Sequence, residues 1–415
     1  MWRSSSSVPS PRCSSHPFRG LNPRFVCVLN NTVSAPTPEM PPGFDAGVNE
    51  ARTQRLIELI STGEAIALVG AGVSIQAGYD SWSGLLTKLE GAANAIRPGL
   101  DEHASTCDPR DYLSLAQRIR DHVVNPPDPA GKSRWYNEIG RIFARDDEAI
   151  LSSLTPLHRD LVGLPFRAFC TTNYESVIEV ALRDVVPSRG QPQAVAVWNG
   201  NDRRILSPAI RGIAGAQGGV PYVIHLHGMY WAEGTVIMCA DEYADAYGIP
   251  TLGLLGPPSA EGEPPPPRSA PSRPMPLLLL TTALMTTRRV VFIGFSLDDV
   301  YLTEVLRRVS DLLWEWDTTT HFAIMPLDLS KGTEQIQRAA DLKRQMGIET
   351  VFYSVDGGSH AALENLISRI ANEVHARTAV ATGEPTRSVA AAGGGPLADW
   401  VERNNVVQLA KVEAR

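Results

Sequence analysis

The spacing of apolar and polar residues along the chain predicts an α/β fold. A segment with an apolar helical face ends near Gly63, which indicates a helix with a glycine cap. The apolar run AIALV at residues 65–69 follows and predicts a short buried strand, which leads through a glycine turn into a second helix. A strand, a turn and a helix in this order form the first unit of an α/β fold.

Strands and helices are expected to alternate through the rest of the chain. The expected strands are 166–172, 221–228, 235–239, 289–296, 321–327 and 350–355. The expected helices are 175–185, 277–287, 299–316, 333–346 and 362–374. Parallel strands need long crossover connections, which are usually helices, so this alternation predicts a Rossmann-like, doubly wound parallel sheet.

Other segments depart from this alternation. Residues 83–160 have helical spacing almost throughout and predict a helical insertion. Residues 256–276 contain consecutive prolines, which exclude helix and sheet and indicate an exposed loop. We expect one domain over residues 46–378. A flexible tail with one short helix is expected over residues 379–415.

The first 45 residues are rich in Ser, Pro and Arg and show no helical or strand period. Such a composition buries too little apolar surface to offset the entropy cost of ordering, so we expect residues 1–45 to be disordered. Two further interpretations of residues 1–39 stay open. They are an organellar targeting segment, or an upstream extension of a protein whose true initiator is Met40.

The net charge of −7 conceals an uneven distribution. Four of the 38 basic residues lie in residues 1–38, which contain no acid, so the remaining chain has 34 basic against 45 acidic side chains and a formal charge of −11. An acidic surface disfavours direct nucleic-acid binding. No apolar run approaches the roughly 18 residues of a membrane span. We therefore expect a soluble, cytoplasmic protein.

The glycine turn at residues 70–74 is the first candidate for chemistry. Glycines between a buried strand and a helix let the backbone approach a pyrophosphate, although a tight turn without a ligand has the same pattern. A P-loop is excluded, because the GKS at residues 131–133 requires a glycine where the chain has Pro126. A dinucleotide is therefore favoured over nucleoside triphosphate hydrolysis.

Polar residues cluster where four of the expected strands end. These clusters are residues 171–175, 225–228, 294–299 and 357–360. The carboxyl ends of parallel strands meet at one edge of a sheet, where open α/β sheets bind their ligands. The four clusters therefore predict a shared crevice.

Structural interpretations of the same residues stay open when each is taken alone. Asn173 is a plausible N-cap for the helix at 175–185, and Ser296 or Asp298 for the helix that begins near residue 299. Strand alternation puts His225 and His227 on the same face of one strand, where both could be structural.

Four motifs in order carry a resemblance to a known family. The strings GAGVSIQAGYDSW, TTNYE, HLHG and FIGFSLDD resemble the sirtuin-like (silent information regulator two) superfamily, and more narrowly its bacterial branch of NAD-consuming effectors in anti-phage defence. The resemblance spans about residues 50–375. Two positions depart from the family pattern. Glu175 stands where an aspartate is common, and Asp80 stands where a proline often occurs.

The resemblance implies an NAD+ glycohydrolase that produces nicotinamide and ADP-ribose. By this resemblance Asn173 holds the ribose or the attacking water, and His227 is the general base. The implied NAD-binding residues are Gly70, Ala71, Gly72, Ser74, Thr172, Gly294, Ser296 and Asp299. The role of Asp299 is open between turn capping and ribose binding. Trp82 or Tyr174 is expected to shield the ribose, although aromatic side chains more often serve packing.

The cysteines separate two activities within this family. Protein-deacylating members carry a zinc module built from two CxxC pairs, and this chain has none. Its cysteines are Cys13, Cys27, Cys107, Cys170 and Cys239. We therefore expect no metal and favour hydrolysis over deacylation. An NAD- or ADP-ribose-binding regulatory subunit, and a deacylase or ADP-ribosyltransferase, stay open as alternatives.

The partners follow from the resemblance alone. Residues after 378 are too few to form a sensor domain, so we expect a homo-oligomer that works with a separately encoded protein. By analogy this partner is a hexameric DNA-translocase-type ATPase or a short Argonaute. Because unrestrained NAD+ loss would harm a cell, the activity is expected to await a trigger.

Overall fold

The structure, a computed structural model, describes residues 41–101, 103–124, 129–186, 192–196, 222–247, 276–295, 297, 300–313, 321–355 and 359–382. The proline-rich segment therefore lies outside the described residues except for Pro276, where a helix begins. Almost all of residues 1–45 and all but the first four residues of 379–415 also lie outside them.

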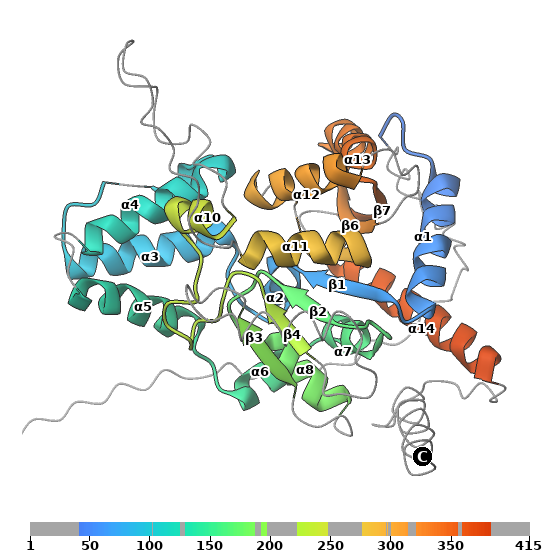
Figure 1. The fold of residues 1–415 in the computed structure, drawn as a ribbon, viewed down its shortest axis with the longest axis horizontal. Coiled ribbons are helices and arrows are strands. Elements are labelled where there is room, and N and C mark those ends of the chain that lie inside the picture. Colours follow the sequence, from blue (N-terminus) through green and yellow to red (C-terminus); the bar gives the residue numbers. More distant parts are fainter. Residues whose placement is uncertain are drawn as a thin grey trace, which may run out of the picture. The chain divides into compact units, whose positions relative to one another are not determined.

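A parallel sheet of seven strands forms the framework, in the order β3-β4-β2-β1-β5-β6-β7 (Figure 1). The strands are β1 Ala65–Val69, β2 Phe169–Thr171, β3 Gln193–Ala196, β4 Tyr222–His225, β5 Arg289–Ile293, β6 His321–Asp328 and β7 Ile348–Val355. The prediction of a parallel sheet is confirmed, and β3 is a strand that the sequence pattern did not indicate.

Helices connect these strands. They are α1 Ala46–Ser61, α2 Ala71–Gln76, α3 Trp82–Ile96, α4 Tyr112–Val124, α5 Pro129–Phe143, α6 Asp147–Ser153, α7 Pro156–Gly163, α8 Val177–Val185, α10 Ala240–Tyr247, α11 Pro276–Thr287, α12 Val300–Leu313, α13 Gly332–Met346 and α14 Ala361–Thr382. Two 3₁₀ turns, η1 Ala104–Thr106 and η2 Pro109–Asp111, precede α4.

The helices cover both faces of the sheet, as a doubly wound fold requires. In β1, Ala67 and Val69 pack into one hydrophobic core with residues of α1, α7, α8 and α14. Ile66 and Leu68 point the other way and pack into a second core with residues of α10, α11, α12 and α13. Because β1 is apolar on both sides, it lies in the middle of the sheet.

Helices α3, α4 and α5 lie between β1 and β2 in the chain and pack on one another beside the sheet (Figure 1). Buried Leu115 and Ile119 of α4 and Trp135 of α5 belong to the same core as the α1 and α8 side chains. Helix α4 also contacts α10. These helices therefore bring the residues that follow β1 close to those that follow β4.

The order in which strands are added to the sheet reverses at β1. Strands β2, β3 and β4 lie on one side of it and β5, β6 and β7 on the other, and this reversal creates the crevice of the fold. Strand β1 pairs with β2 on one side and β5 on the other, and Val69 is level with both Thr171 and Ile293. Thr171 is in turn level with His225 of β4. The carboxyl ends of four strands thus lie at one height, where doubly wound sheets bind ligands.

One expected strand is wrong. Residues 235–239 belong to no strand, and a hydrogen bond of 2.9 Å from Ile237 N to His227 O ties this segment to the turn after β4. Val236 and Met238 pack into one core and Ile237 into the other. Their apolar pattern therefore reflects burial on two sides and not strand pairing.

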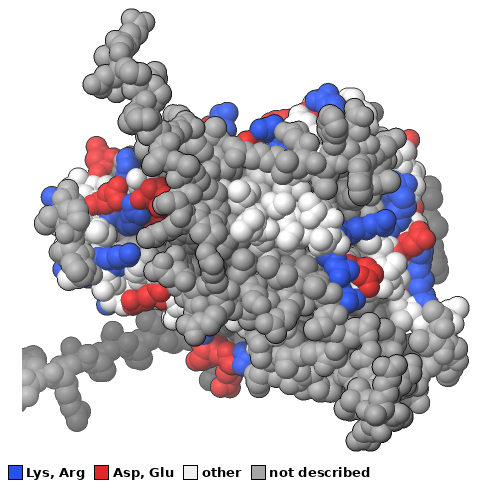
Figure 2. Space-filling view, in the orientation of Figure 1, with Lys and Arg blue, Asp and Glu red and all other residues white. Residues whose placement is uncertain are grey.

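Charged side chains of both signs are interspersed on the described parts of the surface (Figure 2). Many form ion pairs between elements, such as Arg369 on α14 with Glu50 on α1. Across the described residues, no helix combines the length and apolar character that crossing a bilayer requires.

Candidate functional site

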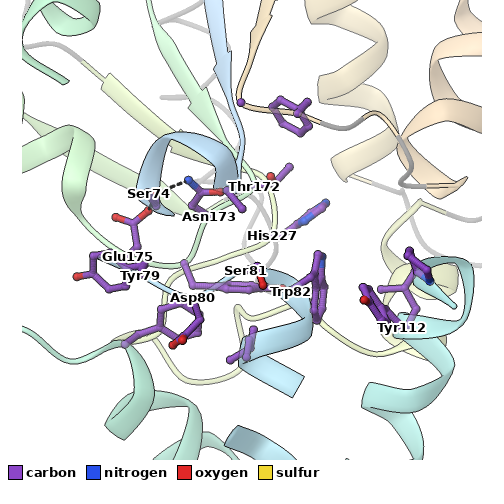
Figure 3. Close-up of a pocket in the computed structure, with 18 of the residues that line it drawn as sticks. Ser74, Tyr79, Asp80, Ser81, Trp82, Tyr112, Thr172, Asn173, Glu175 and His227 are labelled. Atoms are coloured by element: carbon purple, nitrogen blue, oxygen red, sulfur yellow. Dashed lines mark hydrogen bonds between the residues drawn. The ribbon is translucent and has the colours of Figure 1, made fainter. Parts of the chain in front are cut away.

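A cavity opens where β1, β2, β4 and β5 end, and six of the expected site residues line it. These six are Ala71, Ser74, Thr172, Asn173, His227 and Gly294. Figure 3 shows Thr172, Asn173 and His227 together, with Trp82 nearby. Gly70 and Gly72 do not line the cavity. Ser296 and Asp299 lie outside the described residues.

Asn173 is held by its carboxamide nitrogen. Its Nδ2 group donates to Ser74 Oγ at 2.7 Å and to the carbonyl of Gly70 at 3.1 Å (Figure 3). Its backbone N–H donates to Thr171 Oγ1, which follows from the tight turn at the end of β2. Because Nδ2 is occupied on both sides, the amide plane is fixed, which leaves Oδ1 for another partner.

Glu175 completes this chain of hydrogen bonds. Ser74 donates its hydroxyl to Glu175 Oε1, and the N–H of Val177, the first residue of α8, donates to Oε2 at 2.6 Å. Burial raises the pKa of Glu175, although these two hydrogen bonds partly oppose the shift. The carboxyl group therefore anchors Ser74, and through it Asn173, at the start of α8.

A second buried pair, His225 and Glu179, is bonded to the backbone of Asn173. The ring of His225 bonds through Nδ1 to the Asn173 carbonyl at 2.9 Å and through Nε2 to Glu179 Oε1 at 2.6 Å. Burial alone lowers the pKa of His225, but the Glu179 carboxylate and the carbonyl outweigh it and raise the pKa. Since both ring nitrogens face acceptors, His225 is best satisfied as an imidazolium.

His227 has a different environment, so the expectation that both histidines share one face is wrong. Strand β4 ends at His225, and beyond it the two-residue period no longer applies. His227 turns to the opposite side and bonds to the hydroxyls of Tyr243 and Tyr247 at 3.0 and 2.9 Å. Burial lowers the pKa of His227 to about 3, so the imidazole is neutral at physiological pH.

The glycine of the HLHG string allows the turn after His227. Gly228 has a φ of +84°, and a Cβ there would lie 2.0 Å from the carbonyl oxygen of Thr235. A side chain at this position is therefore excluded by contact as well as by conformation. The close approach of the two segments sets the position of His227.

The two positions after β1 that are glycine leave no room for a side chain, because the loop after β5 lies against them. A Cβ on Gly70 or Gly72 would lie 2.6 or 2.9 Å from the carbonyl oxygen of Gly294. The N–H of Gly70 donates to Ile293 O and that of Gly72 donates to Gly294 O. These glycines therefore join the loops after β1 and β5, and Ala71 and Ser74 are the turn residues that face the cavity.

Aromatic rings form much of the remaining wall. Phe143 of α5 packs edge-to-face on Tyr174 and stacks on Tyr79, whereas Trp82 and Tyr112 are neighbours at the other side. The sequence indicated Trp82 and Tyr174 but missed the other three. They lie on or beside the helical segment, where aromatic spacing looks the same as ordinary core spacing.

Arg110 is a further residue that the sequence analysis missed. It lies in η2, lines the cavity and pairs with Asp108 at 2.8 Å. Among the lining residues that the structure describes, it is the only Lys or Arg. A cation at this place is suited to a negatively charged ligand.

The described residues of the fourth polar cluster, Ser359 and His360, do not line the cavity. Gly357 and Gly358 lie outside the described residues. His360 bonds to the hydroxyl of Tyr353 at 2.8 Å and lies after β7, the last strand at the far edge of the sheet. For the described part of the chain, no cluster of three or more His, Cys, Asp or Glu side chains is placed to hold a metal.

Comparisons with known proteins relate this chain to one family of domains and to several named enzymes. The family of SIR2-like domains matches residues 167–351, which contain Asn173 and His227. The chain is 30% identical over 131 residues to the NAD(+) hydrolase ThsA of Enterococcus faecium, covering 32% of this chain and 23% of that protein. It is 23% identical over 330 residues to ThsA of Bacillus cereus, covering 77% of this chain and 56% of that protein. The chain thus spans about half or less of these relatives.

Proposed function

Because the chain carries a SIR2-like domain, we propose that it is an NAD+ hydrolase that produces nicotinamide and ADP-ribose. One observation carries the proposal. Asn173 and His227, from the ends of two parallel strands, line the same cavity at the carboxyl edge of the sheet. The relatives named NAD(+) hydrolase support the same substrate.

Breaking the bond between nicotinamide and ribose develops positive charge on the ribose while a neutral base leaves. The protein must therefore orient the ribose and place a nucleophile in a pocket that restricts water. Asn173 is suited to this task, since its fixed amide presents Oδ1 to a ribose hydroxyl or to the attacking water. The aromatic rings of Phe143 and Trp82 line the cavity and are proposed to limit the access of bulk water.

His227 supplies the general base of this proposal. Its depressed pKa keeps the ring neutral, so a nitrogen lone pair is available to accept a proton. Such a base raises the nucleophilicity of a ribose hydroxyl or of water. General base catalysis of this kind is typically worth about 10²–10⁴-fold in rate.

The rest of NAD+ is assigned to the loops around the crevice. Ala71, Ser74 and Thr172 face the cavity beside the reactive ribose and are proposed to contact the diphosphate. Gly294 is proposed to support the adenosine half, together with Ser296 and Asp299. Gly70 and Gly72 act in this proposal by shaping the turn. The guanidinium of Arg110 adds a positive charge at the same cavity.

We extend the proposal to biology by the resemblance alone. The protein is proposed to act in the cytoplasm as a triggered effector of anti-phage defence that depletes NAD+. It is proposed to form a homo-oligomer and to work with a separately encoded partner, a DNA-translocase-type ATPase or a short Argonaute. Any sensing of nucleic acid is assigned to that partner.

NAD+ consumption by the purified protein, with and without the product of the neighbouring gene, tests the proposal. Asn173→Ala and His227→Ala are expected to lower turnover by at least about 100-fold. Asn137→Ala and His103→Ala are matched controls, since both side chains are exposed and outside the cavity, and they should leave turnover unchanged.

Other outcomes point to other functions. Turnover that survives in both Asn173→Ala and His227→Ala contradicts the proposed site. Binding of ADP-ribose without NAD+ turnover under any trigger indicates a regulatory subunit. A rate that depends on an added peptide indicates deacylation or ADP-ribosyl transfer.

A further inference from the structure

Two tyrosines of one helix enclose the proposed base. Tyr243 and Tyr247 are four residues apart on α10, so they lie on the same face of that helix. The Tyr243 hydroxyl bonds to His227 Nδ1 and the Tyr247 hydroxyl bonds to Nε2. No motif in the sequence pointed to either residue.

The two tyrosines differ in their relation to the cavity. Tyr243 lines it together with His227, and its ring is 4.8 Å from the imidazole between centroids. Tyr247 does not line the cavity, and its ring is 6.0 Å away. Both rings are buried, so Tyr243 differs from Tyr247 in bordering the cavity as well as the imidazole.

Helix α10 is anchored so that this contact is well defined. Arg120 of α4 forms two hydrogen bonds to the Asp241 carboxylate, at 2.9 and 2.7 Å, and a third to Glu242 at 3.2 Å. Glu242 in turn accepts the N–H groups of Met238 and Cys239. The first turn of α10, which directly precedes Tyr243, is thus fixed to α4.

A neutral imidazole has one donor and one acceptor nitrogen, whereas a phenol hydroxyl both donates and accepts. The two contacts can therefore be satisfied together in either of two directions, one for each tautomer of the imidazole. In the first, the Tyr243 hydroxyl donates to Nδ1 and Nε2–H donates to the Tyr247 oxygen, and in the second both bonds are reversed. The first direction points the basic lone pair of His227 to Tyr243, the tyrosine that lines the cavity.

We propose that Tyr243 is a catalytic residue that relays a proton from the substrate to His227. This inference rests on the proposed NAD+ hydrolysis. The substrate's ribose hydroxyl, or the attacking water, gives its proton to the Tyr243 oxygen as the Tyr243 proton moves to Nδ1. Tyr243 stays neutral, His227 becomes an imidazolium that donates to Tyr247, and the substrate oxygen keeps the electron pair of its broken O–H bond.

The matched pair Tyr243→Phe and Tyr247→Phe tests the relay. Each variant removes one hydroxyl bonded to the same imidazole and keeps the ring. Tyr243→Phe is expected to lower kcat by about 100-fold with KM within about twofold, and Tyr247→Phe by about tenfold or less. Equal losses in the two variants, or full activity of Tyr243→Phe, would overturn the relay, because a packing role predicts no difference between them.

Proton inventories in H₂O–D₂O mixtures add a readout that packing does not change. A plot of the wild-type kcat against the deuterium fraction is expected to be curved, because at least two protons move in the proposed step. A linear dependence overturns the relay. If Tyr243→Phe does not fold, 3-fluorotyrosine incorporated at position 243 keeps the ring and hydroxyl and makes the phenol more acidic. An unchanged kcat and unchanged pH profile in that protein also overturn it.

A measurement without NAD+ separates this inference from the proposed function. ¹⁵N NMR of the free protein is expected to show His227 with Nδ1 unprotonated and Nε2 protonated. The Nδ1 signal should shift in Tyr243→Phe and stay nearly unchanged in Tyr247→Phe. A protonated Nδ1 in the wild type contradicts the relay, whereas absence of NAD+ turnover with this tautomer present contradicts only the proposed function.

Discussion

Glu175 illustrates how the surroundings of one residue determine its pKa and its role in the site. From the sequence it was a departure from the aspartate common at this position. In the structure the carboxyl group is buried and links Ser74 with the first turn of α8. The charge of Glu179 raises its pKa further, and that of His225 lowers it. Burial outweighs the favourable contacts, so the pKa is raised.

Glu175→Gln tests this position. The native state holds the Glu175 proton more tightly than the unfolded state, so its contribution to stability is greatest below the ordinary pKa of about 4.3 and is lost as pH rises through the raised folded pKa. The free energy of unfolding by urea should therefore fall less from pH 4 to pH 8 in Glu175→Gln than in the wild type.

The same variant should lose NADase activity by tenfold or more. Ser74 and Val177 donate to different oxygens of the carboxyl group, and glutamine replaces one of these oxygens with an NH2 group, so one of the two contacts is lost and the orientation of Asn173 is weakened. Glu148→Gln, on the exposed surface of α6, is the control for both measurements. Identical pH dependence of Glu175→Gln and wild type would contradict the raised pKa.

At the scale of elements, the contact between α4 and α10 decides where the proposed base lies. The sequence indicated α4 as part of a helical insertion and gave no indication of α10. Arg120 joins the two helices through Asp241 and Glu242, and its side chain is 17% exposed. Its energetic contribution should therefore lie between the ~0–1 kcal/mol of surface pairs and the ~3–5 kcal/mol lost when a buried pair is broken.

Arg120→Met should lower the melting temperature and reduce NAD+ turnover by about tenfold or more. Methionine keeps most of the side-chain volume but leaves Asp241 and Glu242 without their shared cation, so α10 is released from α4. Thermal denaturation and steady-state kinetics measure the two effects. Arg141→Met, which removes an exposed pair within α5, should change neither. Unaltered turnover in Arg120→Met would show that α10 needs no such anchor.

At the scale of the whole molecule, the cavity joins segments that are far apart in the chain. Its described lining runs from Ala71 to Leu297 and includes residues from α3, α5 and α10 as well as the strand ends. Strand β1 pairs on both sides and connects the two halves of the sheet. A ligand in this cavity therefore contacts both halves at once.

ADP-ribose should stabilise the wild-type protein against heat. A ligand that binds only the native state adds about 2.7 kcal/mol at 100 times its Kd, which corresponds to a rise of several degrees. ADP-ribose lacks the nicotinamide bond, so it can be used without turnover. Differential scanning fluorimetry should show a shift that Arg110→Gln reduces, because that change removes a positive charge from the lining of the cavity. Absence of any shift at millimolar ADP-ribose contradicts a dinucleotide site.

The sequence by itself determined the framework. Strand β1 and the turn into α2 were predicted where they lie, and strand β5 was predicted with its correct start but with an end three residues beyond Ile293, because an apolar run bounded by glycine or a helix has a local signature. The sequence also predicted that Asn173 and His227 share a crevice, since their motifs follow strands whose carboxyl ends must meet, and both residues line the cavity. Both features depend on short-range pattern and on a general rule of parallel sheets.

Only the tertiary structure decided how these residues are supported. Ser74 and Glu175 are 101 positions apart, and Tyr243 reaches His227 from a helix with no motif. Burial on two faces made residues 235–239 resemble a strand, and the end of β4 at His225 reversed the side of His227. Periodicity specifies which side of an element is buried, but the partner across a packed core depends on the arrangement of all elements together.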